Sequence, residues 1–285
     1  MNKRGLALII AYMVMVGLSI LGSGLLWRSF SESNVVQRHA NSCAAFWLAE
    51  AGIARAINSF PQSPINDILG DANHTYSTQT AQVVGFIDRF AITSIGTVTL
   101  PSGSTITRTV EAVVRQPQFG AVDNAITATG DVIVGGAAQV NGNIDDNSTF
   151  NFEDIFDLTQ AQVKAQADHF YLDPPNDVEP VDGITWIEMT PGEELVISSN
   201  LWNGSGILIV EGDLKIAGGD FSGILWVTGT LQFTAGNPDM FGAIFVDCGA
   251  SDTVVLGTAE ITHDPVAIAE SLGSISPVSI SWSEL

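Results

Sequence analysis

The C-terminal part of this chain contains almost no basic residues. After position 115 only Lys164 and Lys215 carry a positive charge, no arginine occurs, and 25 acidic residues stand against these two. Such a segment repels nucleic-acid phosphates and has no basic patch that could release counterions from a polyanion. We therefore expect no nucleic-acid contact by this acidic region and a soluble, mutually repelling exterior, with calcium or a basic partner left open.

Cysteine is also scarce. The chain has two, Cys43 and Cys248, about 200 residues apart and without C-x-x-C, zinc or haem spacing. A disulfide framework is excluded. Two interpretations remain open: one bridge between these two residues outside the reducing cytosol, or Cys43 as a small buried residue of a helix.

The sequence also lacks the constellations of an enzyme. A glycosidase needs two carboxyls held across a groove, and the nearest such pair, Asp213 and Asp220, falls in glycine-rich turns where solvated acids are expected. Phosphate-cradling glycine motifs and a serine nucleophile elbow are absent. We expect no catalytic activity, no cofactor and no metal site. The histidines are scattered without ligand spacing, at His39, His74, His169 and His263.

A long uncharged run dominates the N-terminus. From Leu6 to Trp27 there is no charged residue over 22 positions, and Lys3 and Arg4 precede it on a short tail. As a helix this run spans about 33 Å, close to the thickness of a bilayer core. The positive-inside rule keeps the N-terminus cytoplasmic and sends the chain after Trp27 across the membrane. A secretory signal competes with this interpretation, but no small-residue cleavage site is clear.

The helical pattern continues beyond the membrane segment. No proline occurs before Pro61, and apolar residues recur at helical spacings from Arg28 to Phe60. We expect residues 6–60 to form one helix, with 6–27 transmembrane and the remainder amphipathic. The first half can pack with other copies, and the second can anchor a globular domain.

Two sequence motifs give this helix a family resemblance. The run Gly5-Leu6-Ala7-Leu8-Ile9, and the run from Ala45 to Ile53 that contains Ala49-Glu50-Ala51-Gly52, resemble the paired signatures of PilX-type minor pilins of type IV pili. The resemblance implies that residues 1–5 are a leader that prepilin peptidase removes between Gly5 and Leu6, followed by methylation of the new amine. Gly5 and Leu6 would be substrate residues and not catalysts.

The resemblance also implies a location, partners and a role. The protein would reside in the inner membrane and then in an extracellular pilus, with major and minor pilins as partners. Most major pilins carry glutamate where this chain has Ile10, the fifth residue after the expected cleavage. Its absence favours a structural minor pilin of low copy number that acts in pilus assembly, priming or tip formation, with a tip adhesin as a further potential partner.

The rest of the chain is β-rich. Residues 61–115 show β-branched alternation that includes Val84 and Phe86 and is broken by a turn at Pro101–Ser104, which predicts an antiparallel meander. Residues 116–285 contain short apolar strands that restart after 17 and 19 residues, at Gly206, Gly223 and Gly242. This period favours a parallel β-helix-like solenoid over an antiparallel sandwich. The composition of residues 158–172 predicts an inserted helix.

The expected fold class is therefore α+β, with a long N-terminal helix, an antiparallel meander and a C-terminal solenoid. Two other functional hypotheses use the same fold. A membrane-anchored surface adhesin would bind a ligand through its solenoid, with or without calcium. A secreted β-helix enzyme would turn over carbohydrate and be free of the membrane.

Overall fold

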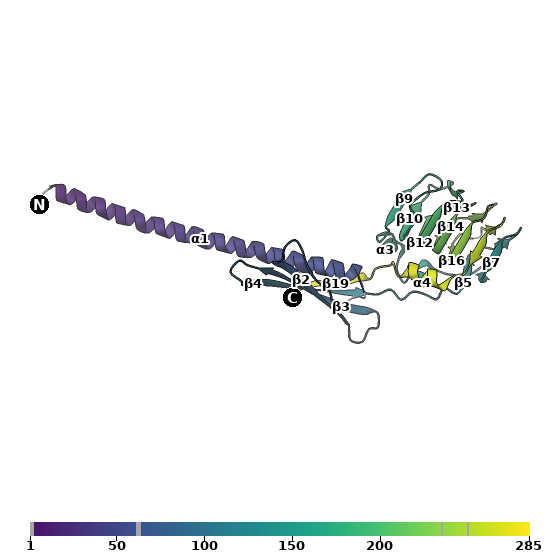
Figure 1. Ribbon diagram of the computed structural model, residues 1–285, viewed down its shortest axis with the longest axis horizontal. Coiled ribbons are helices and arrows are strands. Elements are labelled where there is room, and N and C mark those ends of the chain that lie inside the picture. The colour runs from purple at the N-terminus through teal and green to yellow at the C-terminus, as the bar shows by residue number, and fades with distance from the viewer. Residues whose placement is uncertain (1–2, 61–63, 235, 250) are drawn as a thin grey trace. The chain divides into compact units, whose positions relative to one another are not determined.

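The chain folds into two compact units. The structure is a computed structural model that describes residues 3–60, 64–234, 236–249 and 251–285, with side chains from residue 12 onward (Figure 1). One unit contains Met1–Arg115 and Ser279–Leu285, and the other contains Gln116–Val278. The second unit is thus an insertion between two segments of the first, and each unit is described by itself.

The first unit packs a sheet against part of one helix. Helix α1 runs without interruption from Lys3 to Asn58, 56 residues. The sheet has the strand order β1-β2-β3-β4-β19, and β2 pairs antiparallel with β3 and β3 with β4. The expected long helix and antiparallel sheet are confirmed. The strands are β1 Asn66–Ile68, β2 His74–Gln82, β3 Arg89–Thr99, β4 Thr105–Arg115 and β19 Val278–Glu284.

The C-terminal end of α1 has a local cap. The backbone N–H and the hydroxyl of Ser59 both donate to the carbonyl of Arg55, at 3.0 and 2.7 Å. These bonds satisfy a carbonyl that the helix itself leaves without a partner. The helix ends at Asn58, two residues before the expected limit at residue 60, and Pro61 lies outside the described residues.

The connection between β2 and β3 contains residues that the sequence pattern placed in a strand. Val84 and Phe86, expected in a strand, lie in the connection between β2 and β3, where Val84 is 96% exposed. Val83 N–H donates to the carbonyl of Arg89 at 2.9 Å, which closes the hairpin there. The Arg89 guanidinium lies 4.1 Å from the centre of the Phe86 ring.

The expectation that the solenoid extends to residue 285 is wrong at its end. Strand β19 lies beside β4 at the edge of the first sheet, and Leu285 N–H donates to the carbonyl of Thr109 at 3.0 Å. Its partner is more than 160 residues earlier in the sequence, so no local periodicity could assign it. The chain leaves the first unit after β4 and returns to the neighbouring strand.

The second unit is a parallel β-solenoid built from two sheets, which confirms the solenoid and not the sandwich. One sheet has the order β7-β18-β16-β14-β12-β10-β9, with β5 beside β16 and β8 beside β5, and the other has the order β11-β13-β15-β17-β6. Every described pairing in both sheets is parallel. The strands are β5 Asn124–Ala128, β6 Val132–Val134, β7 Gln139–Asn141, β8 Asn143–Asp145, β9 His169–Leu172, β10 Ile184–Glu188, β11 Glu194–Ile197, β12 Asn203–Glu211, β13 Asp213–Ile216, β14 Asp220–Val227, β15 Leu231–Phe233, β16 Asp239–Val246, β17 Thr253–Val255 and β18 Glu260–Thr262.

The stacking order differs from the chain order. From β9 to β18 each turn stacks on the previous one, but the next layer is supplied by β5, β6 and β7, which pair with β16, β17 and β18. The first strands of the unit therefore cover the turn made by its last strands. This placement satisfies backbone groups of β16–β18 that would otherwise form an open edge.

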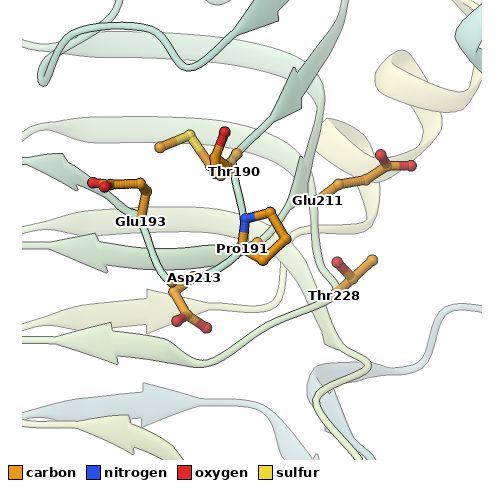
Figure 2. Close-up of a pocket in the computed structure, with 9 residues that line it drawn as sticks. Thr190, Pro191, Glu193, Glu211, Asp213 and Thr228 are labelled. Carbon is orange, nitrogen blue, oxygen red and sulfur yellow. The ribbon is translucent and has the colours of Figure 1, made fainter.

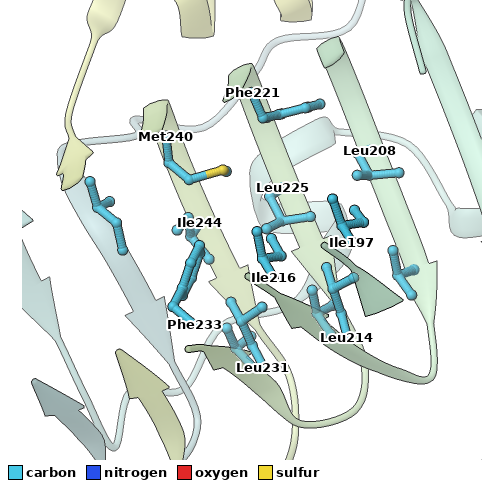
Figure 3. Close-up of a cluster of buried hydrophobic side chains, with 14 of the residues drawn as sticks. Ile197, Leu208, Leu214, Ile216, Phe221, Leu225, Leu231, Phe233, Met240 and Ile244 are labelled. Atoms are coloured by element: carbon cyan, nitrogen blue, oxygen red, sulfur yellow. The ribbon is translucent and has the colours of Figure 1, made fainter. Parts of the chain in front are cut away.

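Three strands of the larger sheet are buried on both faces in their C-terminal segments. In β14, Leu225 and Val227 point into the core between the two sheets, drawn in Figure 3, while Ile224 and Trp226 belong to a second cluster under the helices. β12 and β16 repeat this alternation in register. Double-sided burial explains why these segments are continuous apolar runs instead of alternating ones.

Short helices cover the outer face of these segments. They are α2 Phe152–Phe156, α3 Gln160–Lys164 and α4 Pro265–Leu272, and they contribute Phe156, Val163, Ile268 and Leu272 to the second cluster. The helix expected over 158–172 is wrong in extent, because only α3 is helical and His169–Leu172 forms β9. Pairing with β10 overrides the helical composition there.

A column of glycines stacks through the long strands. Gly206, Gly223 and Gly242 occupy equivalent positions in β12, β14 and β16, with φ of +98°, +140° and +136°. A Cβ on Gly242 would lie 1.9 Å from the carbonyl oxygen of Gly223. Both the backbone conformation and the close stacking therefore require glycine.

Replacing Gly242 with alanine should destabilise the solenoid by more than about 3 kcal/mol, since strain and overlap add. The matched control is Gly192→Ala, where φ is +92° but nothing lies within 4 Å of the added Cβ, so that only backbone strain of about 1 kcal/mol applies. Urea unfolding followed by fluorescence of the buried Trp186, Trp202 and Trp226 measures both. Equal losses in the two variants would contradict the stacking argument.

Candidate functional site

The first part of α1 has an apolar surface that its own chain does not cover. Residues from Tyr12 to Phe30 are exposed, including Leu21 at 66% and Trp27 at 80%. The hydroxyls of Ser19 and Ser23 donate to the carbonyls of Met15 and Ser19 at 2.8 Å each, so they add no unsatisfied donor to this surface. By length and composition, the helix is able to cross a membrane.

Glycines in this segment have open surroundings. At Gly17, Gly22 and Gly24 nothing lies within 4 Å of an added Cβ. They are interior helical residues, and no other described part of the chain lies against them. Small residues of this kind let another helix approach closely.

The expected processing residues lie at the start of the same helix. Gly5 and Leu6 are within α1, whose described backbone begins at Lys3. Their side chains lie outside the described residues. Cleavage between them stays a prediction.

The motif Ala49-Glu50-Ala51-Gly52 forms the contact between α1 and its sheet. Ala49 is fully buried, while Glu50 and Ala51 are half-buried at the margin. A Cβ on Gly52 would lie 2.3 Å from Ser94 Oγ and 2.9 Å from the Tyr76 ring. The motif thus permits a close approach of helix and sheet.

The sheet contributes a matching glycine that sequence analysis missed. A Cβ on Gly96 of β3 would lie 2.0 Å from the carbonyl oxygen of Ala45 and 2.6 Å from the amide nitrogen of Ala49. Ala45, Ala49, Gly52 and Ala56 follow helical spacing along one face, which was a usable signal, but the sequence gave no sign of their partner strand. Contacts this close place α1 firmly on β3.

Arg55 fixes the sheet margin to the same helix. Its guanidinium donates to the Asp67 carboxylate on β1 and to Tyr76 Oη on β2, the latter at 3.3 Å. The Arg55 side chain therefore connects α1 to both β1 and β2.

The outer surface of the solenoid carries a column of carboxylates. Asp220, Asp239 and Glu260 are paired in register at the starts of β14, β16 and β18. Partial burial, together with the charges of Asp220 and Glu260, raises the pKa of Asp239 above its ordinary value. The column is thus a repulsive element within the stack.

Other acids of the solenoid are used in its turns. Asp213 accepts hydrogen bonds from the N–H and hydroxyl of Thr230, at 2.7 and 2.9 Å, and Asp173 accepts from Thr190 in the same way. The hydrogen bonds from Thr190 hold the pKa of Asp173 below its usual value. These carboxylates connect successive turns and do not converge on a reacting centre.

A shallow hollow of about 460 Å³ lies beside Asp213. Its acids, Glu193, Glu211 and Asp213, point in different directions (Figure 2). Asp213 and Asp220, which the sequence analysis took for solvated acids of turns, lie in different surroundings: Asp213 accepts from Thr230, and Asp220 lies beside Asp239 in the carboxylate column. Among the described residues, no group of three or more His, Cys, Asp or Glu side chains is arranged to hold a metal ion.

The histidines and cysteines make separate local contacts. His74 pairs with Asp71 at 2.7 Å, His169 with Asp182 at 2.6 Å, and His263 contacts the carbonyl of Val122 at 2.9 Å. Both cysteines are free thiols, and Cys43 is exposed beside His39 at 3.8 Å. The expectation that Cys43 is buried in the helix is wrong, because it lies on the face of α1 away from the sheet.

These features define an α+β protein with one membrane-length helix, an antiparallel sheet packed on it and a parallel β-solenoid. No family model and no curated protein matches the chain. Among solved structures, it matches the competence-associated pilin ComZ from Thermus thermophilus with 10% identity and a TM-score of 0.28, over 86% of this chain and 98% of that one. A similarity at this level carries no argument about function.

Replacing Gly52 with alanine should destabilise the first unit by about 2 kcal/mol, because overpacking against Ser94 and Tyr76 exceeds the helix propensity gained. Gly24→Ala is the control, since its added Cβ meets nothing within 4 Å. Thermal unfolding of the detergent-solubilised protein, monitored by circular dichroism, compares them. A Gly52 variant as stable as the Gly24 variant would exclude the close helix–sheet contact.

Asp239→Asn should stabilise the solenoid by about 0.5 kcal/mol at neutral pH, the scale of like-charge pairs on adjacent strands. Because its pKa is raised on folding, ionisation of Asp239 destabilises the fold above the ordinary carboxyl pKa, and the gain should vanish as the pH falls below that range. Exposed Asp252→Asn is the control. Urea midpoints at several pH values test this, and a pH-independent gain would refute it.

Proposed function

We propose that this chain is a membrane-anchored structural subunit of a type IV pilus or related filament, most similar to a minor pilin. The observation that carries the proposal is the division of α1. Its first part has an uncovered apolar surface of membrane length, and its later part is packed against an antiparallel sheet through Ala45, Ala49 and Gly52. One helix therefore supplies both an anchor and the support of a folded unit.

Assembly follows from burying the apolar surface of α1. Inside the bilayer, lipid covers this surface; when the subunit leaves the membrane, helices of other pilins must replace the lipid. Gly17, Gly22 and Gly24 allow close approach between such helices. The partners are thus other pilins, and the protein moves from the inner membrane into a surface filament.

Processing precedes assembly in this proposal. Prepilin peptidase would cleave between Gly5 and Leu6 and leave an N-methylated Leu6, in line with the motif resemblance. The chain has Ile10 where a glutamate would pair with a neighbouring amine, and each subunit carries a solenoid inserted between β4 and β19. Both features favour few copies per filament, in a priming or tip role, over a repeating shaft subunit.

The proposed role is structural and not catalytic. Asp213 is engaged in a turn and Asp239 is stacked in a column with Asp220, so neither is placed for a shared reaction. A surface adhesin remains the second candidate, favoured by the solvent-facing column of Asp220, Asp239 and Glu260 on the inserted unit. Binding of a ligand by the full-length protein, lost on replacing these acids, would support the adhesin.

The mature N-terminus tests the proposal. Mass spectrometry of protein from cells with and without prepilin peptidase should find N-methyl-Leu6 only when the peptidase is present. A Gly5→Leu variant should remain uncleaved, with Gly17→Leu as a control inside the helix. An intact Met1 in peptidase-containing cells, or cleavage after Trp27, would contradict the pilin proposal.

A further inference from the structure

The larger sheet of the solenoid ends in a strand whose outer edge is unpaired. Strand β9, His169–Leu172, pairs in parallel with β10 on one side, and no described strand pairs with its other side (Figure 1). Glu188 of β10 lies opposite Leu172, and its carbonyl accepts from the N–H of Asp173 at 2.9 Å. Leu172 therefore directs its own N–H and carbonyl away from β10, and Phe170 does the same because the direction alternates along a strand.

Two other edge strands of the solenoid are protected. At the same end of the stack, the loop before β10 covers the outer edge of β11. Val196 N–H donates to Asn176 Oδ1 at 3.1 Å, and Asp177 N–H donates to the Val196 carbonyl at 3.0 Å. At the opposite end, the edge strand β8 carries the exposed Asp145. Covering and charge are common protections of a sheet edge, and among the described residues β9 has neither.

The side chains of β9 place an apolar surface beside this open edge. Phe170 is 51% exposed and Leu172 66% exposed, whereas Tyr171, which points to the opposite face, packs against the core between the two sheets. Phe170 lies opposite the buried Trp186 of β10. Lys164 Nζ lies 5.0 Å from the centre of the Phe170 ring and 5.7 Å from that of Trp186. The apolar layer that contains Trp186 thus continues to Phe170, where its cover ends.

The charge around β9 favours one kind of partner. Asp182 contacts His169 at 2.6 Å and lines, together with Glu179, a shallow hollow of about 580 Å³. After position 115 the chain has 25 acidic residues against two basic ones. A second copy of the solenoid would bring the same negative charge to this edge, so pairing between copies is opposed and a basic partner is attracted.

We propose that β9 is a docking site for an extended, basic segment of another protein, which adds to the larger sheet as a further strand. Main-chain hydrogen bonds to Phe170 and Leu172 give the segment its affinity, and its alternate side chains give specificity. Apolar residues of the segment cover Phe170 and Leu172, and basic residues between them fall on the face of His169, near Asp182. The site belongs to the solenoid and does not rest on the proposed place of α1 in a filament.

A synthetic peptide tests the proposal. The probe is a short, fluorescein-labelled peptide of alternating lysine and valine, titrated into the full-length, detergent-solubilised protein. Fluorescence anisotropy should show saturable binding. The same peptide with methylated backbone nitrogens keeps its charge but cannot donate to β9, so it should bind at least about tenfold more weakly. A peptide with glutamate in place of lysine should not bind.

Two substitutions at β9 place the peptide on the protein. Leu172→Pro removes an outward-facing N–H and no hydrogen bond to β10, so the affinity should fall about fivefold, the scale of one hydrogen bond. Leu172→Lys sets a like charge against the peptide and should weaken binding about tenfold. Val84→Lys, the same charge change at a 96% exposed side chain of the first unit, is the control and should leave the affinity unchanged. Urea midpoints from tryptophan fluorescence verify that each variant is folded.

Crosslinking separates strand addition from general charge attraction. A peptide with benzoylphenylalanine in place of one valine should give adducts on β9, which mass spectrometry identifies. Absence of binding, binding that survives backbone methylation, or adducts confined to the column of Asp220, Asp239 and Glu260 would overturn the docking site. Dimers of the peptide-free protein that Leu172→Lys abolishes, measured by light scattering, would overturn the basic occupant in favour of a second copy.

Discussion

The apolar surface of α1 must be covered, and the chain itself covers only part of it. Near Ala49 and Gly52 the sheet approaches until a single added methyl group would meet Ser94, and this contact removes one helical face from water. From Tyr12 to Phe30 no described residue of the first unit provides such cover. The helix therefore needs a second environment, first lipid and then, in our account, other helices.

The solenoid also has apolar surfaces that must be covered, and its own unit covers them. Its repeated apolar segments are buried on both faces only because α2, α3 and α4 cover the outer one, with Trp226 beneath Phe152 at a ring-centre distance of 4.9 Å. The edge that β16–β18 form at the end of the stack is covered by β5–β7, which come from the beginning of the unit. The helices remove an apolar face from water, and β5–β7 pair with strands whose exposed edges would otherwise invite pairing with other chains.

Much of this architecture could be predicted from local patterns. The run of uncharged residues after Leu6, the absence of proline before Pro61 and the recurrent segments at Gly206, Gly223 and Gly242 predicted the helix and the solenoid. The interactions that remained hidden join distant segments: β19 with β4, β5 with β16, and Gly96 with Ala45. None of these contacts produces a periodic pattern in the sequence, because each depends on which segments meet after folding.

The candidate site could likewise be predicted only in part from the sequence. The sequence indicated Ala49 and Gly52 through a resemblance, but only the structure shows that they act by letting the helix approach β3. It also places Trp282 beside Phe46, although about 236 residues separate them. The composition of residues 158–172 predicted a helix through the short strand His169–Leu172. That segment is a strand because it pairs with β10, which the local sequence does not reveal.

The central claim is that α1 carries this protein out of the membrane into a filament. Immunogold electron microscopy with antibodies against the solenoid, applied to filaments sheared from intact cells, tests it most directly. The account predicts sparse gold particles on the filaments, concentrated at their ends, and none on filaments from cells lacking this chain. Labelling confined to the membrane fraction, with unlabelled filaments, would contradict it.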